Sequence, residues 1–189
     1  IVCHENGNLT GDNTDAYGFI NNIQTSVPTW NAERATALIL GAGGAARAVI
    51  SALKDAGVPE IRICNRTRER AEELRTHFGH LNVVDWDDRS DACLGTGLLV
   101  NTTTLGMVGK PPLEIDIHQL NEGAIVNDIV YVPLKTDLLV AAESQGHQAV
   151  DGLGMLLHQA CPGFEAWYGQ RPEVTENLRI HILNELGHP

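Results

Sequence analysis

Apolar and polar segments alternate along most of this chain. Short apolar runs, of the length of buried strands, are separated by stretches in which apolar residues recur at helical spacing. This pattern is typical of an α/β protein with a doubly wound parallel sheet and right-handed crossovers. It predicts strands at 37–41, 60–65, 81–85, 97–101, 124–128 and 147–151. It predicts helices at 44–57, 67–78, 114–120 and 136–146, with 86–95 irregular or briefly helical.

The two ends of the chain do not follow this alternation. The Asn6-Gly7 pair predicts a hairpin within residues 1–10, and a helix follows that ends at Pro28. Two more helices are predicted after the sheet, one ending near Tyr168 and one over 175–186. A terminal hairpin is poorly supported alone, so we expect these parts to rest on a second domain. The expected division is 1–30 for a remnant of that domain with a bridging helix, 31–151 for the sheet domain, and 152–189 for helices that pack back.

A glycine-rich turn joins the first sheet strand to the helix behind it. Its spacing is Gly41-x-Gly43-x-x-Ala46, a fingerprint of dinucleotide binding in Rossmann-type folds. Gly41 allows the tight turn, Gly43 lets a pyrophosphate approach the backbone, and Ala46 lets helix and strand pack closely. The alternative is a glycine-rich turn that binds nothing. If the site exists, its residues are Gly41, Ala42, Gly43, Gly44, Ala45 and Ala46.

The next predicted strand indicates which dinucleotide is bound. An NAD site of this type has an acidic residue about 20 positions after the glycines. Here Asn65 and Arg66 take that place, and an arginine can bind a 2′-phosphate that a carboxylate would repel. Thr67 can cap the following helix, and Arg70 lies one turn later on the same side. We therefore expect NADP as the cofactor, with a solvated helix start as the alternative and Arg68 directed to solvent.

Candidate ligand contacts also follow the later strands, where ligands bind in such sheets. Thr103 and Thr104 suit contact with ribose or phosphate, although such a loop can simply satisfy its own backbone. Tyr131 suits the wall of a cleft or the edge of a core. After the last strand, three further candidates lie on one segment: Gly152, Met155 and Gln159. For Met155 the alternative is an ordinary core position.

Composition narrows the class of partner. The chain has 13 basic and 24 acidic side chains, a net charge of −11, which disfavours nucleic acid and anionic membranes as partners. We expect neither a membrane span nor a secretory signal. The four cysteines contain no C-x-x-C pair and suit a reducing, cytoplasmic compartment. No histidine is set in a metal-ligand pattern, so we expect no metal.

Three good helix-capping residues stand side by side at Asn13-Thr14-Asp15. One helix needs only one cap. The surplus indicates that Asp15 faces a pocket, and plain capping is the alternative.

These motifs together resemble the shikimate dehydrogenase family. They are Asn13-Thr14-Asp15-x-x-Gly18, Gly41-Ala42-Gly43-Gly44-Ala45-Ala46-Arg47, Asn65-Arg66-Thr67 and Asp151-Gly152-Leu153-Gly154-Met155-Leu156, in this order. The resemblance implies an enzyme that interconverts 3-dehydroshikimate and shikimate with NADP(H) in aromatic amino-acid biosynthesis. It implies that Asp15 is the aspartate of a catalytic lysine–aspartate pair. It also implies that substrate contacts come from Thr14, Asp15, Tyr131 and Gln159, and cofactor contacts from Asn65, Arg66, Thr67, Arg70, Thr103, Thr104, Tyr131, Gly152 and Met155.

The chain departs from the family in one respect. The lysine and other substrate contacts belong to an N-terminal domain, and Lys54, Lys110 and Lys135 lie outside the lysine motif. Since the chain starts at Ile1, inside a predicted strand, we expect it to be the C-terminal two-thirds of such an enzyme, binding NADP but turning over shikimate very poorly. The alternatives are a quinate/shikimate dehydrogenase of broader specificity and an NADP-binding module without chemistry.

Overall fold

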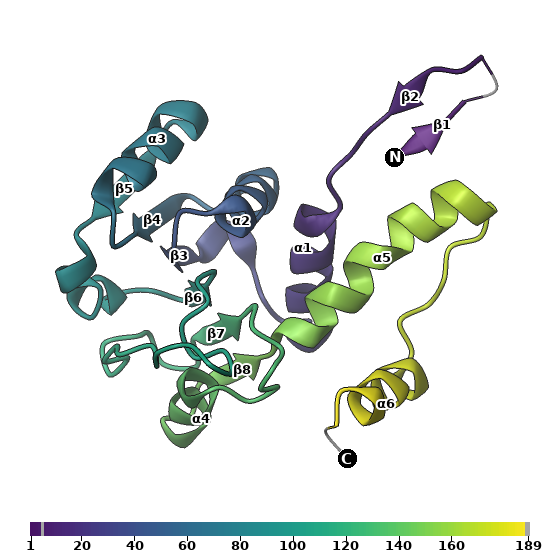
Figure 1. Cartoon of the computed structure of the whole chain (residues 1–189). Coiled ribbons are helices and arrows are strands. Elements are labelled where there is room, and N and C mark those ends of the chain that lie inside the picture. The colour runs from purple at the N-terminus through teal and green to yellow at the C-terminus, as the bar shows by residue number, and fades with distance from the viewer. Residues whose placement is uncertain (5, 188–189) are drawn as a thin grey trace.

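A computed structural model describes residues 1–4 and 6–187, and its centre is a six-stranded parallel sheet (Figure 1). The strands lie in the order β5-β4-β3-β6-β7-β8, so the expected doubly wound sheet is confirmed. Two predicted segments include residues outside this description, the hairpin at Glu5 and the last segment at 188–189. The sheet strands are β3 (Thr36–Leu40), β4 (Glu60–Cys64), β5 (Leu81–Val84), β6 (Leu98–Asn101), β7 (Ile125–Asp128) and β8 (Gln148–Val150).

Each face of the sheet carries its own apolar core. Successive side chains of β3 alternate between them, and residues 37–40 are fully buried. One core is covered by α1 (Asp15–Ser26), α2 (Gly44–Asp55), α3 (Arg68–Phe78) and the start of α5 (Gly152–Tyr168). The other is covered by α4 (Asp137–Ser144) and by the irregular segments around the short 3₁₀ turns Trp86–Asp88 and Asp91–Cys93.

The chain leaves β3 toward β4 and β5 and then returns to β6 on the other side of β3. The connections that follow β3 and β6 therefore diverge, and a crevice opens at the carboxyl ends of these two strands. In doubly wound sheets this crevice is where ligands bind.

The helix predicted over 114–120 is wrong. Residues 113–117 form neither helix nor strand, and burial alternates, with Leu113 and Ile117 buried and Glu114 and Asp116 exposed. This is the two-residue period of an extended chain and not a helical period. The Asp116 carboxylate then accepts a hydrogen bond from the His118 backbone N–H at 3.0 Å, which turns the chain.

Helices α1 and α5 cross at unusually short range because glycines face the neighbouring helix. A Cβ at Gly18 would lie 2.6 Å from the Met155 carbonyl oxygen, and one at Gly154 would lie 1.8 Å from Asn22 Oδ1. Asn22 is buried, and its Nδ2 donates to the Asp151 carbonyl at 2.8 Å. The crossing therefore fixes the start of α1 relative to the last strand of the sheet.

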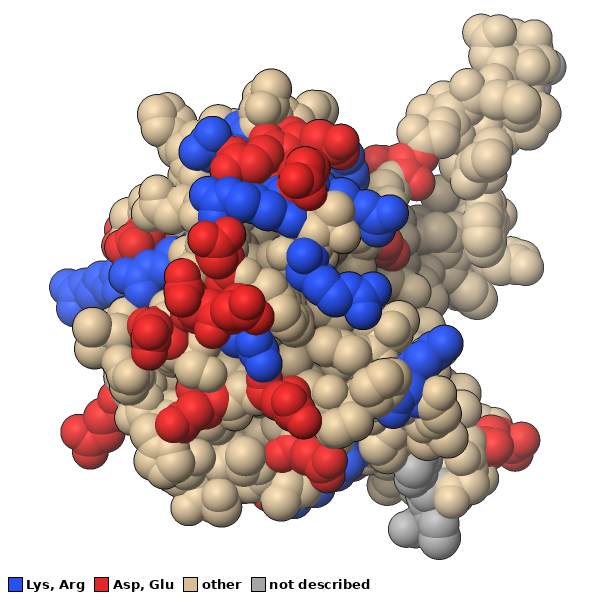
Figure 2. All heavy atoms as spheres, turned by 60° about the vertical axis from the view of Figure 1, so that its left-hand side comes forward, with Lys and Arg blue, Asp and Glu red and all other residues tan. Residues whose placement is uncertain are grey.

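The remaining elements lie beside this body. The hairpin of β1 (Val2–Cys3) and β2 (Leu9–Thr10) projects away from the sheet, as Figure 1 shows, and α6 (Glu176–Glu185) lies below α5. The hairpin residues that the structure describes carry no acidic or basic Asp, Glu, Lys or Arg side chain (Figure 2). Near the end of α5, the side chain of Trp167 is 62% exposed. The Arg179–Asp151 pair, at 2.5 Å, links α6 to the start of α5. The predicted division into 1–30, 31–151 and 152–189 stays a prediction.

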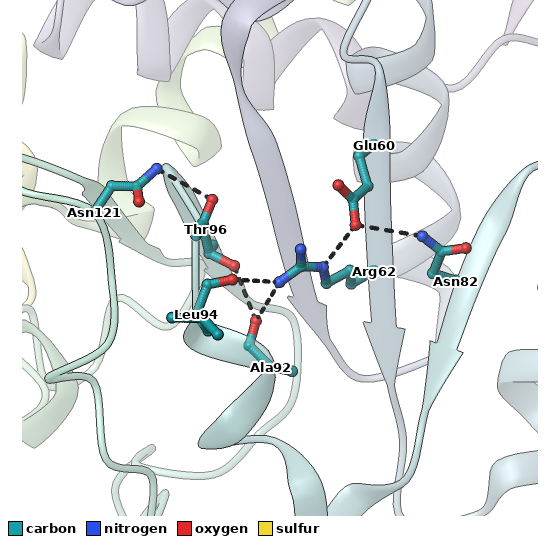
Figure 3. A network of polar contacts seen from close by, with 8 residues as sticks. Glu60, Arg62, Asn82, Ala92, Leu94, Thr96 and Asn121 are labelled. Atoms are coloured by element: carbon teal, nitrogen blue, oxygen red, sulfur yellow. Dashed lines mark hydrogen bonds and ion pairs between the residues drawn. The ribbon is translucent and has the colours of Figure 1, made fainter.

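A polar network ties the connection before β6 to the sheet (Figure 3). Arg62 donates to Glu60 Oε1 at 2.8 Å and to the carbonyl oxygens of Ala92 and Leu94 at 3.0 and 2.6 Å. The hydrogen bond from Arg62 lowers the pKa of Glu60 below its ordinary value. Because Glu60 and Arg62 lie in the first half of β4, away from the crevice, this network is structural.

In the part of the chain that the structure describes, no helix is both long and apolar enough to cross a membrane.

Candidate functional site

The turn between β3 and α2 leaves open space next to a helix N-terminus. Gly41 has φ +107°, and a Cβ there would lie 2.7 Å from Thr102 Oγ1, so this position requires glycine. A Cβ at Gly43 or Gly44 would meet no heavy atom within 4 Å. Among the described residues no side chain caps α2, so its first N–H groups stay available to an anion in that space.

Asn65 connects this turn to the one that follows β4. Its Oδ1 accepts from the Ala42 N–H at 3.1 Å, and its Nδ2 donates to the Thr67 carbonyl at 2.7 Å. The amide thus holds the glycine turn beside the arginine-bearing start of α3. Thr67 occupies the N-cap position of α3, although its hydroxyl makes no capping hydrogen bond.

A hollow of about 400 Å³ lies beside these two turns. Its lining contains two arginines, Arg66 and Arg70, and no carboxylate. Among the described residues neither arginine forms an ion pair, whereas Arg68 pairs with Asp85 at 2.6 Å and with Glu72 at 3.2 Å. Figure 2 shows such mixing of basic and acidic side chains on the face that carries α3. Arg66 and Arg70 therefore give this basic hollow an unneutralised positive charge in an acidic protein.

A second hollow, of about 340 Å³, adjoins the first and is mostly apolar. Thr103 and Thr104 line both hollows. Its other walls are Ala45 of α2, Met107, and the segment 129–132, in which Tyr131 is 37% exposed. The two hollows together form one trough along the carboxyl ends of β4, β3, β6 and β7, with a charged end and an apolar end.

Buried polar groups lie beneath the apolar end. Asp128, at the end of β7, is fully buried and accepts from Asn101 Nδ2 at 3.0 Å, Val130 N–H at 3.1 Å and Thr136 Oγ1 at 2.7 Å. Burial raises the pKa of Asp128 to about 6, although these three hydrogen bonds oppose the rise. Asn101 in turn accepts from the Thr103 N–H at 3.0 Å and from its hydroxyl at 2.7 Å.

Asp15 is the first residue of α1 and is partly buried. Asn13 Oδ1 accepts from the Asp15 N–H at 2.8 Å, so Asn13 forms the turn before the helix. Within residues 1–4 and 6–187, the side chains of Thr14 and Asp15 make no hydrogen bond to the protein. Gly18, one turn after Asp15, lies against Gln159 of α5, where a Cβ would come within 2.7 Å of Gln159 Cβ. Asp15 and Gln159 therefore lie at the same end of the helix crossing.

Comparison with known proteins assigns the family. A family model described as shikimate/quinate 5-dehydrogenase matches residues 23–102. The chain is 55% identical over 185 residues to a shikimate dehydrogenase (NADP(+)) from Paramagnetospirillum magneticum, covering 97% of this chain and 67% of the relative. The chain belongs to the shikimate dehydrogenase family. It spans about two thirds of the length of this curated relative.

Solved structures agree with this membership of the shikimate dehydrogenases. A quinate dehydrogenase from Corynebacterium glutamicum in complex with NAD has a TM-score of 0.88 at 30% identity, over 97% of this chain and 66% of that one. Shikimate 5-dehydrogenase from Thermus thermophilus in complex with NADP(H) and shikimate has a TM-score of 0.75 at 36% identity, over 88% and 60%.

The structure brings together most of the predicted site residues of this shikimate dehydrogenase chain. The hollows are lined by Ala45, Asn65, Arg66, Thr67, Arg70, Thr103, Thr104 and Tyr131. Gly43 and Gly44 are open beside them, whereas Ala46 is fully buried in the core. Thr14, Asp15 and Gln159 lie at the α1–α5 crossing. Gly152 and Met155 differ, because they contact protein. A Cβ at Gly152 would lie 2.2 Å from the Ile129 carbonyl, and Met155 is 7% exposed in the core. Their roles as cofactor contacts stay predictions.

Sequence reasoning missed several residues of the trough. Trp86, Leu105 and Pro111 line the basic hollow, and Met107 lines the apolar one. Trp86 was open to prediction, since it follows the end of β5 and the rule about strand ends applies there too. The buried Asp128–Asn101 contact carries no local signal, because it depends on which strands are neighbours.

Proposed function

We propose that this chain binds NADP(H) along the trough and forms the cofactor-binding part of a shikimate dehydrogenase. The observation that carries the proposal is that a basic hollow and an apolar hollow join at Thr103 and Thr104. The two arginines of the basic hollow form no ion pair with any residue that the structure describes. An extended dinucleotide with a charged adenosine end and a flat nicotinamide end fits this division. NADP is the cofactor named for the curated relative, and it is among the ligands of the Thermus structure.

The basic end suits a 2′-phosphorylated adenosine. Arg66 and Arg70 offer planar forks of donors to a phosphate, and no carboxylate lines the hollow to repel it. Trp86 also lines this hollow, and Arg89 lies over its ring, 4.9 Å from the ring centre. The pyrophosphate would then lie over Gly43 and Gly44, where the turn is open.

The apolar end suits the nicotinamide. When bound, NADP(H) would supply or accept the hydride that interconverts 3-dehydroshikimate and shikimate. The segment 129–132 would exclude water from the ring, and Tyr131 would line the junction with the substrate. Thr14 and Gln159 would bind substrate hydroxyls, and the Asp15 carboxyl group would orient a lysine that protonates the developing alkoxide.

Two of the three lysines of this chain already have partners away from Asp15. Lys54 donates to the Phe78 carbonyl at the far end of α2, and Lys135 pairs with Glu143 of α4. We therefore predict NADP-selective binding by the 189-residue chain and very poor oxidation of shikimate. A cytoplasmic location also stays a prediction.

Calorimetric titration with NADPH and NADH tests the cofactor assignment. Arg66→Gln should weaken NADPH roughly 10- to 100-fold, as expected for lost hydrogen bonds to a charged group, and should leave NADH unchanged. Arg68→Gln is the matched control, since Arg68 lies two residues further on, at the start of α3, but pairs with Asp85. Equal losses for NADPH and NADH, or equal effects of the two variants, would count against the 2′-phosphate site.

A turnover assay with shikimate and NADP⁺ tests the catalytic assignment. Turnover by the 189-residue chain would mean that one of its own lysines works with Asp15, and Asp15→Asn should then abolish the activity. In either case Asp15→Asn should leave NADPH binding unchanged, because Asp15 lies outside both hollows.

A quinate dehydrogenase is the second candidate, because the Corynebacterium structure named so has a TM-score of 0.88 and holds NAD. Preference for NADH over NADPH, or for quinate over shikimate, would favour it. Binding of NADP with no turnover of either shikimate or quinate would favour a cofactor-binding module.

A further inference from the structure

The two loops that form the apolar hollow are joined beneath it by one hydrogen-bond network. Segment 102–107 follows β6, segment 129–132 follows β7, and together they provide all of the lining except Ala45. Asn101 and Asp128 end these two strands and face each other in register. Because parallel partners in register point to the same side of a sheet, their side chains meet.

Asn101 uses its whole hydrogen-bonding capacity. Its two amide hydrogens go to Asp128 Oδ1 at 3.0 Å and to the Leu105 carbonyl at 3.2 Å. Its oxygen accepts from the N–H and the hydroxyl of Thr103, and that hydroxyl accepts from the Leu105 N–H at 3.0 Å. The amide therefore sets the shape of the Thr103–Leu105 turn, and Asp128 sets the orientation of the amide.

The same carboxylate holds the other loop. Asp128 Oδ1 accepts from the Val130 N–H, and Oδ2 accepts from the hydroxyl of Thr136, which is 1% exposed at the start of α4. One buried group thus binds both ends of the segment that carries Tyr131. No charged side chain of the described residues pairs with Asp128.

We propose that Asp128 is a positioning residue, which fixes the two walls of the nicotinamide end relative to each other through Asn101, Val130 and Thr136. The inference rests on the proposed function, since it assigns this hollow to the nicotinamide. It predicts that loss of the carboxylate loosens only the apolar end. The basic hollow, built on Arg66 and Arg70, depends on the separate contact between Asn65 and Ala42.

The test compares NADPH with 2′,5′-ADP, which contains only the adenosine half, by calorimetry on the full chain. Asp128→Ala should weaken NADPH about tenfold, because it leaves buried donors unpaired, and should change 2′,5′-ADP less than about twofold. Asp128→Asn keeps an acceptor for Asn101 and should bind NADPH as tightly as the unmodified chain. Thr136→Val removes one donor with little change in shape and should weaken NADPH binding by about threefold. This variant serves as the test if Asp128→Ala does not fold.

The matched control is Asn127→Ala. Asn127 is a buried amide on the same strand, and its Nδ2 donates to the Val150 carbonyl at 2.9 Å. This variant should lose stability without changing the ratio of the two affinities. Three outcomes would overturn the positioning role alone. In Asp128→Ala or Thr136→Val, the affinities for NADPH and 2′,5′-ADP could fall equally, or NADPH binding could stay unchanged. Alternatively, Asn127→Ala could lose NADPH affinity while keeping 2′,5′-ADP affinity. Absence of NADPH binding by the unmodified chain would overturn the proposed function and this inference with it.

Discussion

The buried carboxylate of Asp128 should make stability depend on pH in an unusual direction. Most carboxylates of folded proteins are ionised and paired, so that acid destabilises the fold. Asp128 has no cationic partner among the described residues, and burial raises its pKa from the ordinary 3.8 to about 6. The folded protein therefore holds this proton more tightly than the unfolded chain does.

The sign and size follow from this difference. Below about pH 4 the carboxyl is protonated in both states and contributes no penalty. As the pH rises from about 4 to 6, the unfolded chain ionises freely and the folded protein does not, so stability falls. A separation of about two pH units corresponds to a total loss of about 3 kcal/mol in the free energy of unfolding, of which about 2 kcal/mol falls between pH 4.5 and 7.5.

The perturbation is Asp128→Asn, which has nearly the same shape and does not ionise. Urea unfolding of both proteins between pH 4.5 and 7.5 gives their difference in free energy at each pH. That difference removes the contributions of other groups, including His147 and His158, whose pKa values burial lowers. From pH 4.5 to 7.5 the free energy of unfolding of the variant should rise by about 2 kcal/mol relative to that of the unmodified protein. A difference that stays constant within about 0.5 kcal/mol would refute the reasoning, because Asp128 would then titrate alike in both states.

Two further predictions concern stability, and both are read from urea unfolding. Gly154→Ala should cost about 1–3 kcal/mol, because its Cβ would lie 1.8 Å from Asn22 Oδ1, whereas Gly163→Ala on the same helix, with its nearest neighbour at 3.7 Å, should be neutral or stabilising. A gain in stability in both variants would mean that helix propensity, and not the crossing, decides. Arg62→Met should cost about 1–3 kcal/mol through its lost hydrogen bonds, while Arg75→Met, which breaks an exposed pair, should stay within about 0.5 kcal/mol. Matching values would show that the network of Figure 3 adds nothing to stability.

The sheet could be predicted from the sequence because its signals are local. Most strands are apolar runs or alternate polar and apolar residues, and the helices between them, apart from the 114–120 segment, show a helical period. The helix prediction for 114–120 is wrong because Leu113, Ile115 and Ile117 follow a two-residue period and not a helical one. The fingerprint turn and the arginines of α3 were predicted for the same reason, since their chemistry is written in consecutive residues.

The rest of the trough depends on which strands are neighbours in the sheet, and no local pattern of residues shows that order. Asn101 and Asp128 are 27 residues apart and meet only because β6 and β7 are neighbours in register. The glycines show the same limit. Gly43 and Gly154 both stand in glycine-rich segments beside helices, yet a Cβ at the first would meet open space and a Cβ at the second would meet Asn22. Only the neighbouring elements decide whether such a glycine makes room for a ligand or for another helix.

The crossing of α1 and α5 connects the catalytic and the cofactor parts of the proposed site. Phe19 and Ile23 of α1 are fully buried in the core that also contains Ile39 of β3, the strand that leads into the fingerprint turn. The position of Asp15 at the start of α1 is therefore set by the same core that sets the trough. A rotation of any other domain against this one would change the distance from Asp15 to groups on that domain, but not its distance to the nicotinamide end. Asp15 thus keeps a fixed place relative to the proposed nicotinamide end.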